Sequence, residues 1–177
     1  QSYIRTRKYN FKLEINNYKI YLFIIMKKNK YEDLTDEEFF NLGIEFDNDT
    51  LSNAVMHWCK NREAAIEEYG DINTWDVTDV TSMKDLFYGE KEFNDDISNW
   101  DVGNVENMDN MFAHAYKFNK SIEKWNVTKV KSMKGMFYHA SSFDQSLNNW
   151  KVSNVVNMKG MFFGASKFNQ PLDKWDT

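Results

Sequence analysis

Two histidines recur with a spacing that raises the question of a metal site. His114 and His139 are separated by the interval at which many other residues of this chain recur, so stacked repeats would bring the two imidazoles together. Imidazole is a common metal ligand, and a zinc site needs about four ligands. Gly89 and Gly164 occupy the equivalent positions in the flanking repeats, and no third ligand is in register. We therefore interpret the pair as solvated side chains and predict no metal site and no cofactor.

The single cysteine and one polar series are the other residues that invite a chemical interpretation. Cys59 follows Trp58 in an apolar helical pattern, which predicts a buried structural thiol rather than a nucleophile. The polar series recurs at the same interval as the histidines and consists of Asn94, Asn119, Asp144 and Asn169. It has too little aspartate and glycine for a calcium ladder, so we predict a ladder of Asx turns. The chain has no phosphate-binding, dinucleotide-binding or HExxH motif, and no enzymatic role is expected.

An internal repeat determines the elements that would position these residues. Five of the six tryptophans follow one constant spacing: Trp75, Trp100, Trp125, Trp150 and Trp175. Methionine and phenylalanine form parallel series: Met83, Met108, Met133 and Met158, and Phe87, Phe112, Phe137 and Phe162. A unit of about 25 residues cannot bury its apolar side alone, whereas stacking aligns each series into a continuous core. These series are therefore predicted to be structural.

Each repeat is predicted to contain one short helix and one very short strand. Residues 82–87 place apolar side chains in a helical pattern behind Ser82, and serine or asparagine recurs there as an expected N-cap. The turn-rich segment 93–100 is predicted to contain the strand, stacked in parallel on its neighbours. The expected fold class is α/β, a right-handed repeat solenoid similar to leucine-rich repeats.

The segment before the repeats is predicted to be a helical N-terminal cap, residues 26–71. A capping box at residues 35–38 begins one helix. A longer helical pattern runs from Leu51 to Gly70, with Asp49 or Thr50 as the expected cap and Asn61 as the expected break between two helices.

The sequence also allows predictions about the first 25 residues and about the end of the repeat array. Residues 1–25 precede the first methionine, are too short in apolar length to span a membrane, and lack a signal-peptide cleavage site. We interpret them as an upstream extension, with a short membrane-targeting segment as the alternative. The lack of a convincing signal peptide or lipobox favours an intracellular or host-cell location over the cell surface. Residues 72–177 hold about four repeats, and the array stops just inside a fresh unit. Either the array is truncated there, or its last unit stays exposed and pairs with another molecule.

The repeat pattern carries a family resemblance. Residues 72–177 follow Trp-Asp-Val-x-x-Val-x-x-Met-x-x-Met-Phe-x-x-Ala-x-x-Phe-Asn, which resembles the repeat of BspA-like proteins. That family is related to leucine-rich repeats and occurs in mycoplasma surface lipoproteins and in large DNA viruses of protists. The resemblance implies a solenoid and a role in surface display or protein interaction.

Charge is distributed unevenly along the chain, although the net charge of −5 argues against a generally basic nucleic-acid binder. Residues 75–109 carry 10 acidic and 2 basic side chains, whereas residues 110–177 carry 4 acidic and 10 basic ones. We expect a non-enzymatic module that binds another protein, with weak end-to-end self-association. The alternative is binding of an anionic ligand or nucleic acid through residues 110–177, which would depend steeply on salt.

Overall fold

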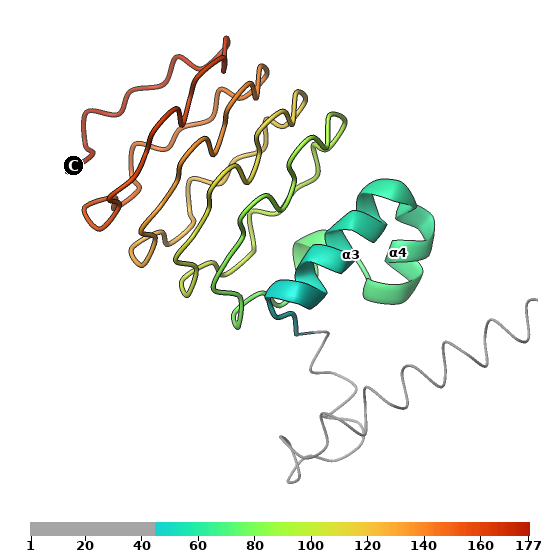
Figure 1. Cartoon of the computed structure of the whole chain (residues 1–177). Coiled ribbons are helices and arrows are strands. Elements are labelled where there is room, and N and C mark those ends of the chain that lie inside the picture. Colours follow the sequence, from blue (N-terminus) through green and yellow to red (C-terminus); the bar gives the residue numbers. More distant parts are fainter. Residues whose placement is uncertain (1–44) are drawn as a thin grey trace, which may run out of the picture. The chain divides into compact units, whose positions relative to one another are not determined.

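The structure is a computed structural model that describes residues 45–177, and these lie within one compact unit of the chain. The described chain begins with two α-helices, α3 (Asn48–Lys60) and α4 (Arg62–Tyr69), and one 3₁₀ turn, η1 (Ile72–Thr74). A stack of irregular coils follows (Figure 1). The extension predicted at residues 1–25 and the capping box predicted at residues 35–38 lie outside the described residues.

Local hydrogen bonds determine where α3 begins. Asp47 and Thr50 form a capping box, in which the Asp47 Oδ1 accepts from the Thr50 backbone nitrogen at 2.8 Å and the Asp47 nitrogen donates to the Thr50 hydroxyl at 2.9 Å. The N-cap is therefore Asp47, and the expected caps at Asp49 and Thr50 are wrong by two and three residues. The apolar side of α3 is buried through Leu51, Ala54, Val55 and Trp58.

The predicted break between the two helices is confirmed. Asn61 ends α3, and its side-chain oxygen accepts from the Ala64 nitrogen at 3.4 Å in the first turn of α4. Gly70 then ends α4 with a positive φ of 74°, a backbone conformation that glycine adopts at little cost. A side-chain contact of 3.3 Å between His57 Nδ1 and Glu68 Oε2 joins the two helices.

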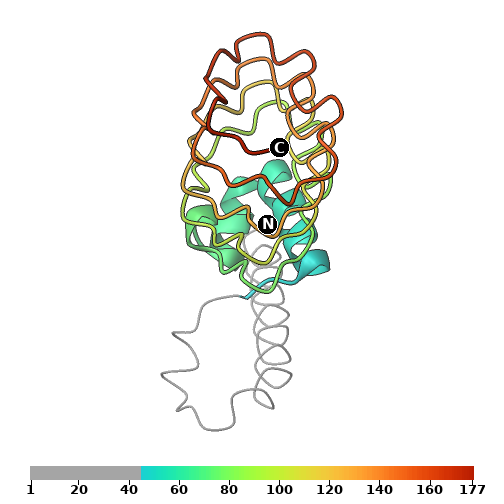
Figure 2. The same ribbon diagram turned by 90° about the vertical axis from the view of Figure 1, so that its left-hand side faces the viewer.

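The coils are joined by backbone hydrogen bonds from alternate residues. The nitrogens of Met83, Asp85, Phe87 and Gly89 donate to carbonyl oxygens of the next coil at distances of 2.8–2.9 Å: those of Asn107, Asp109, Met111 and Ala113. The same pattern recurs one repeat later and again after that. Viewed along the stack, the coils superimpose as nested ovals (Figure 2).

The predicted α/β repeat solenoid is not the fold of residues 45–177. The structure has no strand in this range, and isolated parallel bridges are the only ladder elements between the coils, linking in turn Ser82, Asn107, Ser132 and Asn157. The helices of the described chain are confined to α3, α4 and η1, so the repeats contain no helix either. Residues 82–87, where the repeat helix was expected, form bridges and turns.

Backbone conformation explains why no helix forms in the repeats. Two positions in every coil have a positive φ of 54–75°: Asp85, Asn110, Gly135 and Gly160, and four residues later Gly89, His114, His139 and Gly164. A left-handed residue interrupts the run of right-handed residues that an α-helix requires. The segment whose apolar pattern predicted a helix instead forms tight turns. One of them is closed by a bond of 3.0 Å from the Tyr88 nitrogen to the Asp85 oxygen.

The repeated apolar side chains form the core of the stack. Buried members include four tryptophans, three methionines and three phenylalanines: Trp75, Trp100, Trp125, Trp150, Met83, Met108, Met133, Phe87, Phe112 and Phe137. The last member of each series is only partly buried: Met158, Phe162 and Trp175. Rings of successive coils stack face to face, with 5.6 Å between the centroids of Phe112 and Phe137. Each buried side chain of this size contributes roughly 1.5–3 kcal/mol.

Candidate functional site

One residue directly follows each core phenylalanine: Tyr88, Ala113, Tyr138 and Phe163. Ala113 is buried, whereas the other three residues place a ring at the outside of the stack. Tyr88 is 53% exposed and Phe163 is 60% exposed, whereas Tyr138 is partly buried. Large apolar rings at such exposure are not needed for the core, so they are available for contact with another molecule.

These rings and the neighbouring imidazoles form a continuous series, which we name the aromatic row: Tyr88, His114, Tyr138, His139 and Phe163. The imidazole of His114 lies edge-on to the rings of Tyr88 and Tyr138, at centroid distances of 5.6 and 5.5 Å. It bridges the place where Ala113 has no ring. Tyr138 stacks on Phe163 at 5.1 Å, so the row extends over four coils without a gap.

The two histidines do come together, as their spacing suggested. The imidazoles of His114 and His139 stack at 5.3 Å between centroids. Both residues have left-handed backbone, and glycine takes this position in the flanking coils. A Cβ on Gly164 would lie 2.3 Å from His139 Nδ1, so the glycine leaves room for that imidazole. Within residues 45–177 no group of three or more His, Cys, Asp or Glu residues is arranged to hold a metal ion.

An open hollow of about 320 Å³, here named the groove, borders the aromatic row. Its lining includes two lysines, two glycines and three members of the row: Lys134, Lys159, Gly135, Gly160, Tyr88, His114 and Tyr138. In two successive coils the lysine precedes the glycine and the ring follows three residues after it, so glycines separate cations from rings along the chain. The absence of a side chain at Gly160 keeps this space open, whereas Gly135 is buried against the Asn110 side chain.

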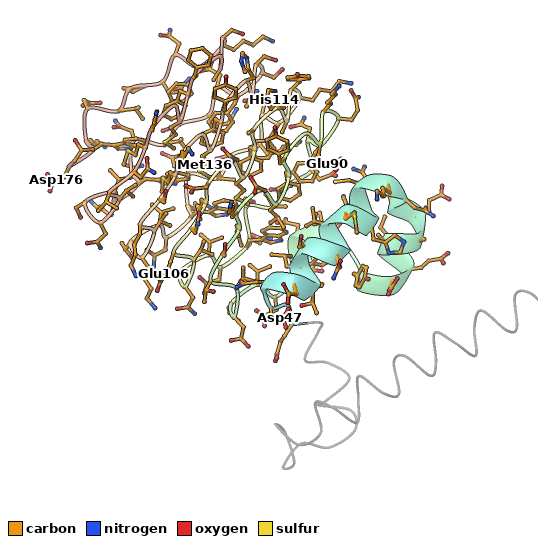
Figure 3. The ribbon with its side chains drawn as sticks, viewed as in Figure 1. Asp47, Glu90, Glu106, His114, Met136 and Asp176 are labelled. Carbon is orange, nitrogen blue, oxygen red and sulfur yellow. The ribbon has the colours of Figure 1, made fainter. Side chains whose placement is uncertain are left out.

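The ammonium groups of the groove lysines form no ion pair in the described part of the chain, although the Asp109 Oδ1 accepts from the Lys134 backbone nitrogen at 2.8 Å. Lys134 and Lys159 are exposed, and neither ammonium group forms an ion pair with any residue of 45–177. By contrast, Lys131 pairs with Glu106 at 2.6 Å. Figure 3 shows Glu106 and His114 at opposite edges of the stack, so this ion pair lies away from the aromatic row. The groove therefore presents positive charge beside aromatic surface.

The comparisons with known proteins bear on the whole of this region. A family model described as "Mycoplasma protein of unknown function, DUF285" matches residues 51–177. The chain belongs to this family. The match begins within α3 and includes all the coils that build the groove. No curated protein and no solved structure matches the chain.

The polar series of this DUF285 chain is a ladder between coils rather than a set of Asx turns. The Asn94 Oδ1 accepts from the Asn119 nitrogen at 2.9 Å, and the Asn119 Oδ1 accepts from the Asp144 nitrogen at 2.9 Å. The Asp144 Oδ1 in turn accepts from the Asn169 nitrogen at 3.0 Å. This backbone bond, helped by the Gln170 amide, lowers the pKa of Asp144 below its ordinary value. The series is thus structural, but it acts between neighbouring coils.

Cys59 is an inert thiol at neutral pH. It is partly buried, and burial together with the nearby Glu90 carboxylate raises its pKa to about 12. Because the thiolate is the reactive form, this thiol is a poor nucleophile.

Across the described part of this DUF285 chain, every helix is too short or too polar to cross a bilayer.

The groove residues other than His114 were not predicted from the sequence, although a repeated sequence pattern marks them. Residues 134–138 read Lys-Gly-Met-Phe-Tyr and residues 159–163 read Lys-Gly-Met-Phe-Phe. The repeat of a lysine, a glycine and an outer ring at the coil spacing marks the groove. This signal is easily taken for part of the core pattern, because the outer ring directly follows the core phenylalanine.

Proposed function

We propose that this protein is a non-enzymatic recognition module that binds another protein through the aromatic row. The observation that carries the proposal is the row itself, in which rings from four coils form one continuous, partly exposed surface. Tyrosine and other aromatic residues are enriched at protein interfaces, because each ring buries a large area at a small cost in side-chain entropy.

The scaffold supports this role by holding the rings in place. The coils are joined by backbone bonds at 2.7–3.1 Å on each side of the row, and the core phenylalanine beneath each ring is stacked on its neighbour. A surface that is already ordered loses little freedom on binding. The similarity of the repeats to BspA-like proteins, for which surface display or protein interaction is implied, is consistent with the same function.

A selection from a displayed polypeptide library tests the proposal. The bait is the full chain, and the counter-bait is the double variant Tyr138→Ser/Phe163→Ser. The matched control is Met56→Ser/Ile66→Ser, because these two side chains are also exposed apolar groups but lie on the helices. We expect polypeptides that bind the full chain and the control and lose binding to the row variant. Equal binding to all three proteins would contradict the proposal.

The second candidate function is binding of an anionic ligand or a nucleic acid through residues 110–177. The ammonium groups of Lys134 and Lys159, which form no ion pair within residues 45–177, lie beside aromatic rings and favour it, because single-stranded nucleic acids bind to cations interleaved with stacking platforms. A labelled single-stranded oligonucleotide distinguishes the two candidates. Tight binding with a steep dependence on salt concentration would favour the nucleic acid.

A further inference from the structure

We propose that the groove binds a short, extended acidic segment of the partner protein, with acidic side chains on Lys134 and Lys159 and an aromatic side chain on Tyr138. This inference rests on the proposed function and names the class of polypeptide that the module recognises.

The spacing of the coils matches an extended peptide. Successive coils place their rings 5.1 Å apart at Tyr138 and Phe163 and 5.6 Å apart at Phe137 and Phe162. In an extended peptide, side chains on the same side repeat every ~6.6–6.8 Å. The flexible stems of Lys134 and Lys159 accommodate the difference of about 1–2 Å. Residues i and i+2 of the peptide therefore reach the two lysines together.

The order of residues along each coil explains why acidic and aromatic side chains should alternate along the bound peptide. The lysines precede the glycines and the rings follow them, so a peptide lying over Gly160 has cations on one side and rings on the other. Successive side chains of an extended peptide point to opposite sides. When residues i and i+2 are acidic and face the lysines, residue i+1 faces Tyr138. An aromatic or apolar residue is favoured there.

Gly160 allows the peptide backbone to approach closely. A Cβ on Gly160 would have Tyr138 Cδ2 as its nearest neighbour, at 3.9 Å, so the space above this glycine is open. Gly135 is instead buried against the Asn110 side chain, which a Cβ there would meet at 2.5 Å. The first coil has Asp85 at the equivalent position, and its carboxylate accepts from the Asn110 amide at 3.0 Å.

Charge selects a short acidic segment over a long polyanion. Towards the first coil, Asp109 takes the position of the groove lysines and Asp85 takes that of the groove glycines, so this end of the groove is an acidic region. A nucleic acid that followed the stack would leave the two lysines and meet this acidic region. A peptide with two acidic groups is satisfied by Lys134 and Lys159 alone.

Fluorescence anisotropy with defined peptides tests the inference on the full chain. The probe is a labelled peptide with the core Glu-Phe-Glu in glycine-serine flanks, and its controls carry Gln-Phe-Gln or Glu-Ser-Glu. The test variant is Lys134→Gln/Lys159→Gln. The matched control is Lys124→Gln/Lys151→Gln, which removes the same charge from two exposed lysines that do not line the groove. Urea unfolding verifies that all variants fold.

We expect the Glu-Phe-Glu peptide to bind more tightly than both control peptides, and the groove variant to weaken its binding roughly fivefold or more while the control variant leaves it unchanged. Equal losses in the two lysine variants would overturn the inference, because they indicate unspecific charge attraction. Tighter binding of a single-stranded oligonucleotide than of the peptide would overturn it in favour of nucleic acid. If the library selection returns row-dependent polypeptides while Glu-Phe-Glu does not bind, this inference fails and the proposed function stands.

Discussion

The indole nitrogen Nε1 of Trp125 donates a hydrogen bond of 3.2 Å to the carbonyl oxygen of Ile97, which belongs to the preceding coil. The same bond joins Trp100 to Ile72 and Trp150 to Ile122. Each of these three indoles therefore fills the core of its own coil and donates to a carbonyl of the segment that precedes it. Repeated side chains set the register of the stack as well as filling its core.

Replacement of Trp125 is expected to destabilise the fold strongly. Trp125→Ala should lower the free energy of unfolding by about 3–5 kcal/mol, because it leaves a large cavity in the middle of the stack. Trp125→Phe keeps most of the apolar area but removes the indole bond to the Ile97 carbonyl, which still accepts from the Trp100 nitrogen at 3.2 Å, so a smaller loss of about 1 kcal/mol is expected. Urea unfolding measures both. The partly buried Trp175 provides the comparison, and Trp175→Ala should cost less than Trp125→Ala.

Two glycines with positive φ form a matched pair for testing backbone strain. Gly160→Ala should cost about 1–2 kcal/mol, because its φ is 68° and an added Cβ meets nothing closer than 3.9 Å. Gly135→Ala should cost more, because its φ is 61° and the Cβ would lie 2.5 Å from the Asn110 Oδ1, which must move. Thermal and urea unfolding measure the difference. Equal stability of the two variants and the unsubstituted chain would show that the left-handed turns are absent.

Acidification is expected to destabilise the protein through carboxylates held in the ionised form. The Thr50 hydroxyl and backbone nitrogen lower the pKa of Asp47, and the Ser98 backbone nitrogen lowers that of Asp96. A carboxylate with a lowered folded pKa contributes stability above its unfolded pKa of about 3.9 and loses it as the pH falls through the folded value. The free energy of unfolding should therefore fall below about pH 4.

The variant Asp47→Asn identifies the contribution of the helix cap to this acid response. Asparagine caps a helix about as well as aspartate but does not titrate in this range. The fall in stability below about pH 4 should therefore be shallower in the variant than in the unsubstituted chain. Urea unfolding at a series of pH values measures it. Identical pH profiles would mean that Asp47 does not form the capping box in solution.

Cys59 is expected to react slowly in the folded protein. Its pKa is raised to about 12, from 9.0 for an ordinary thiol, so the thiolate fraction near neutral pH should fall roughly a thousandfold. Alkylation by iodoacetamide, followed by mass spectrometry, should be correspondingly slower than in the urea-unfolded chain. Glu90→Gln should raise the rate, because it removes a charge that opposes the thiolate. Similar rates in the folded and unfolded chains would contradict the assignment.

Weak self-association is expected through the apolar surface of the fourth coil. A hollow of about 380 Å³ is lined there by Met158, Phe162, Leu172 and Trp175, and Val156 nearby is 88% exposed. Because burial of apolar surface is insensitive to screening, association should rise with protein concentration and persist in added salt. Sedimentation velocity measures it, and Val156→Ser/Leu172→Ser should weaken it. A single monomer species at all concentrations would refute this expectation.

The repeat, its core and the helices that precede it follow from the residue pattern alone. The constant spacing from Trp75 to Trp175 predicts which side chains stack, because a short unit can bury apolar side chains only against copies of itself. Trp100 and Trp125 are buried, as that argument requires. The break at Asn61 and the stop at Gly70 were also readable, since capping depends on a few neighbouring residues.

The conformation of the repeat and the location of the groove depend instead on contacts between coils. The pattern Met83, Leu86, Phe87 fits a helix, but nitrogens such as that of Phe87 bond to the next coil instead of to their own turn. The pairing of the Phe87 nitrogen depends on a carbonyl of the next coil, and local helix propensity does not take such distant partners into account. The groove has the same origin, because Tyr88, Lys134 and Lys159 come from different coils and meet only when the coils stack.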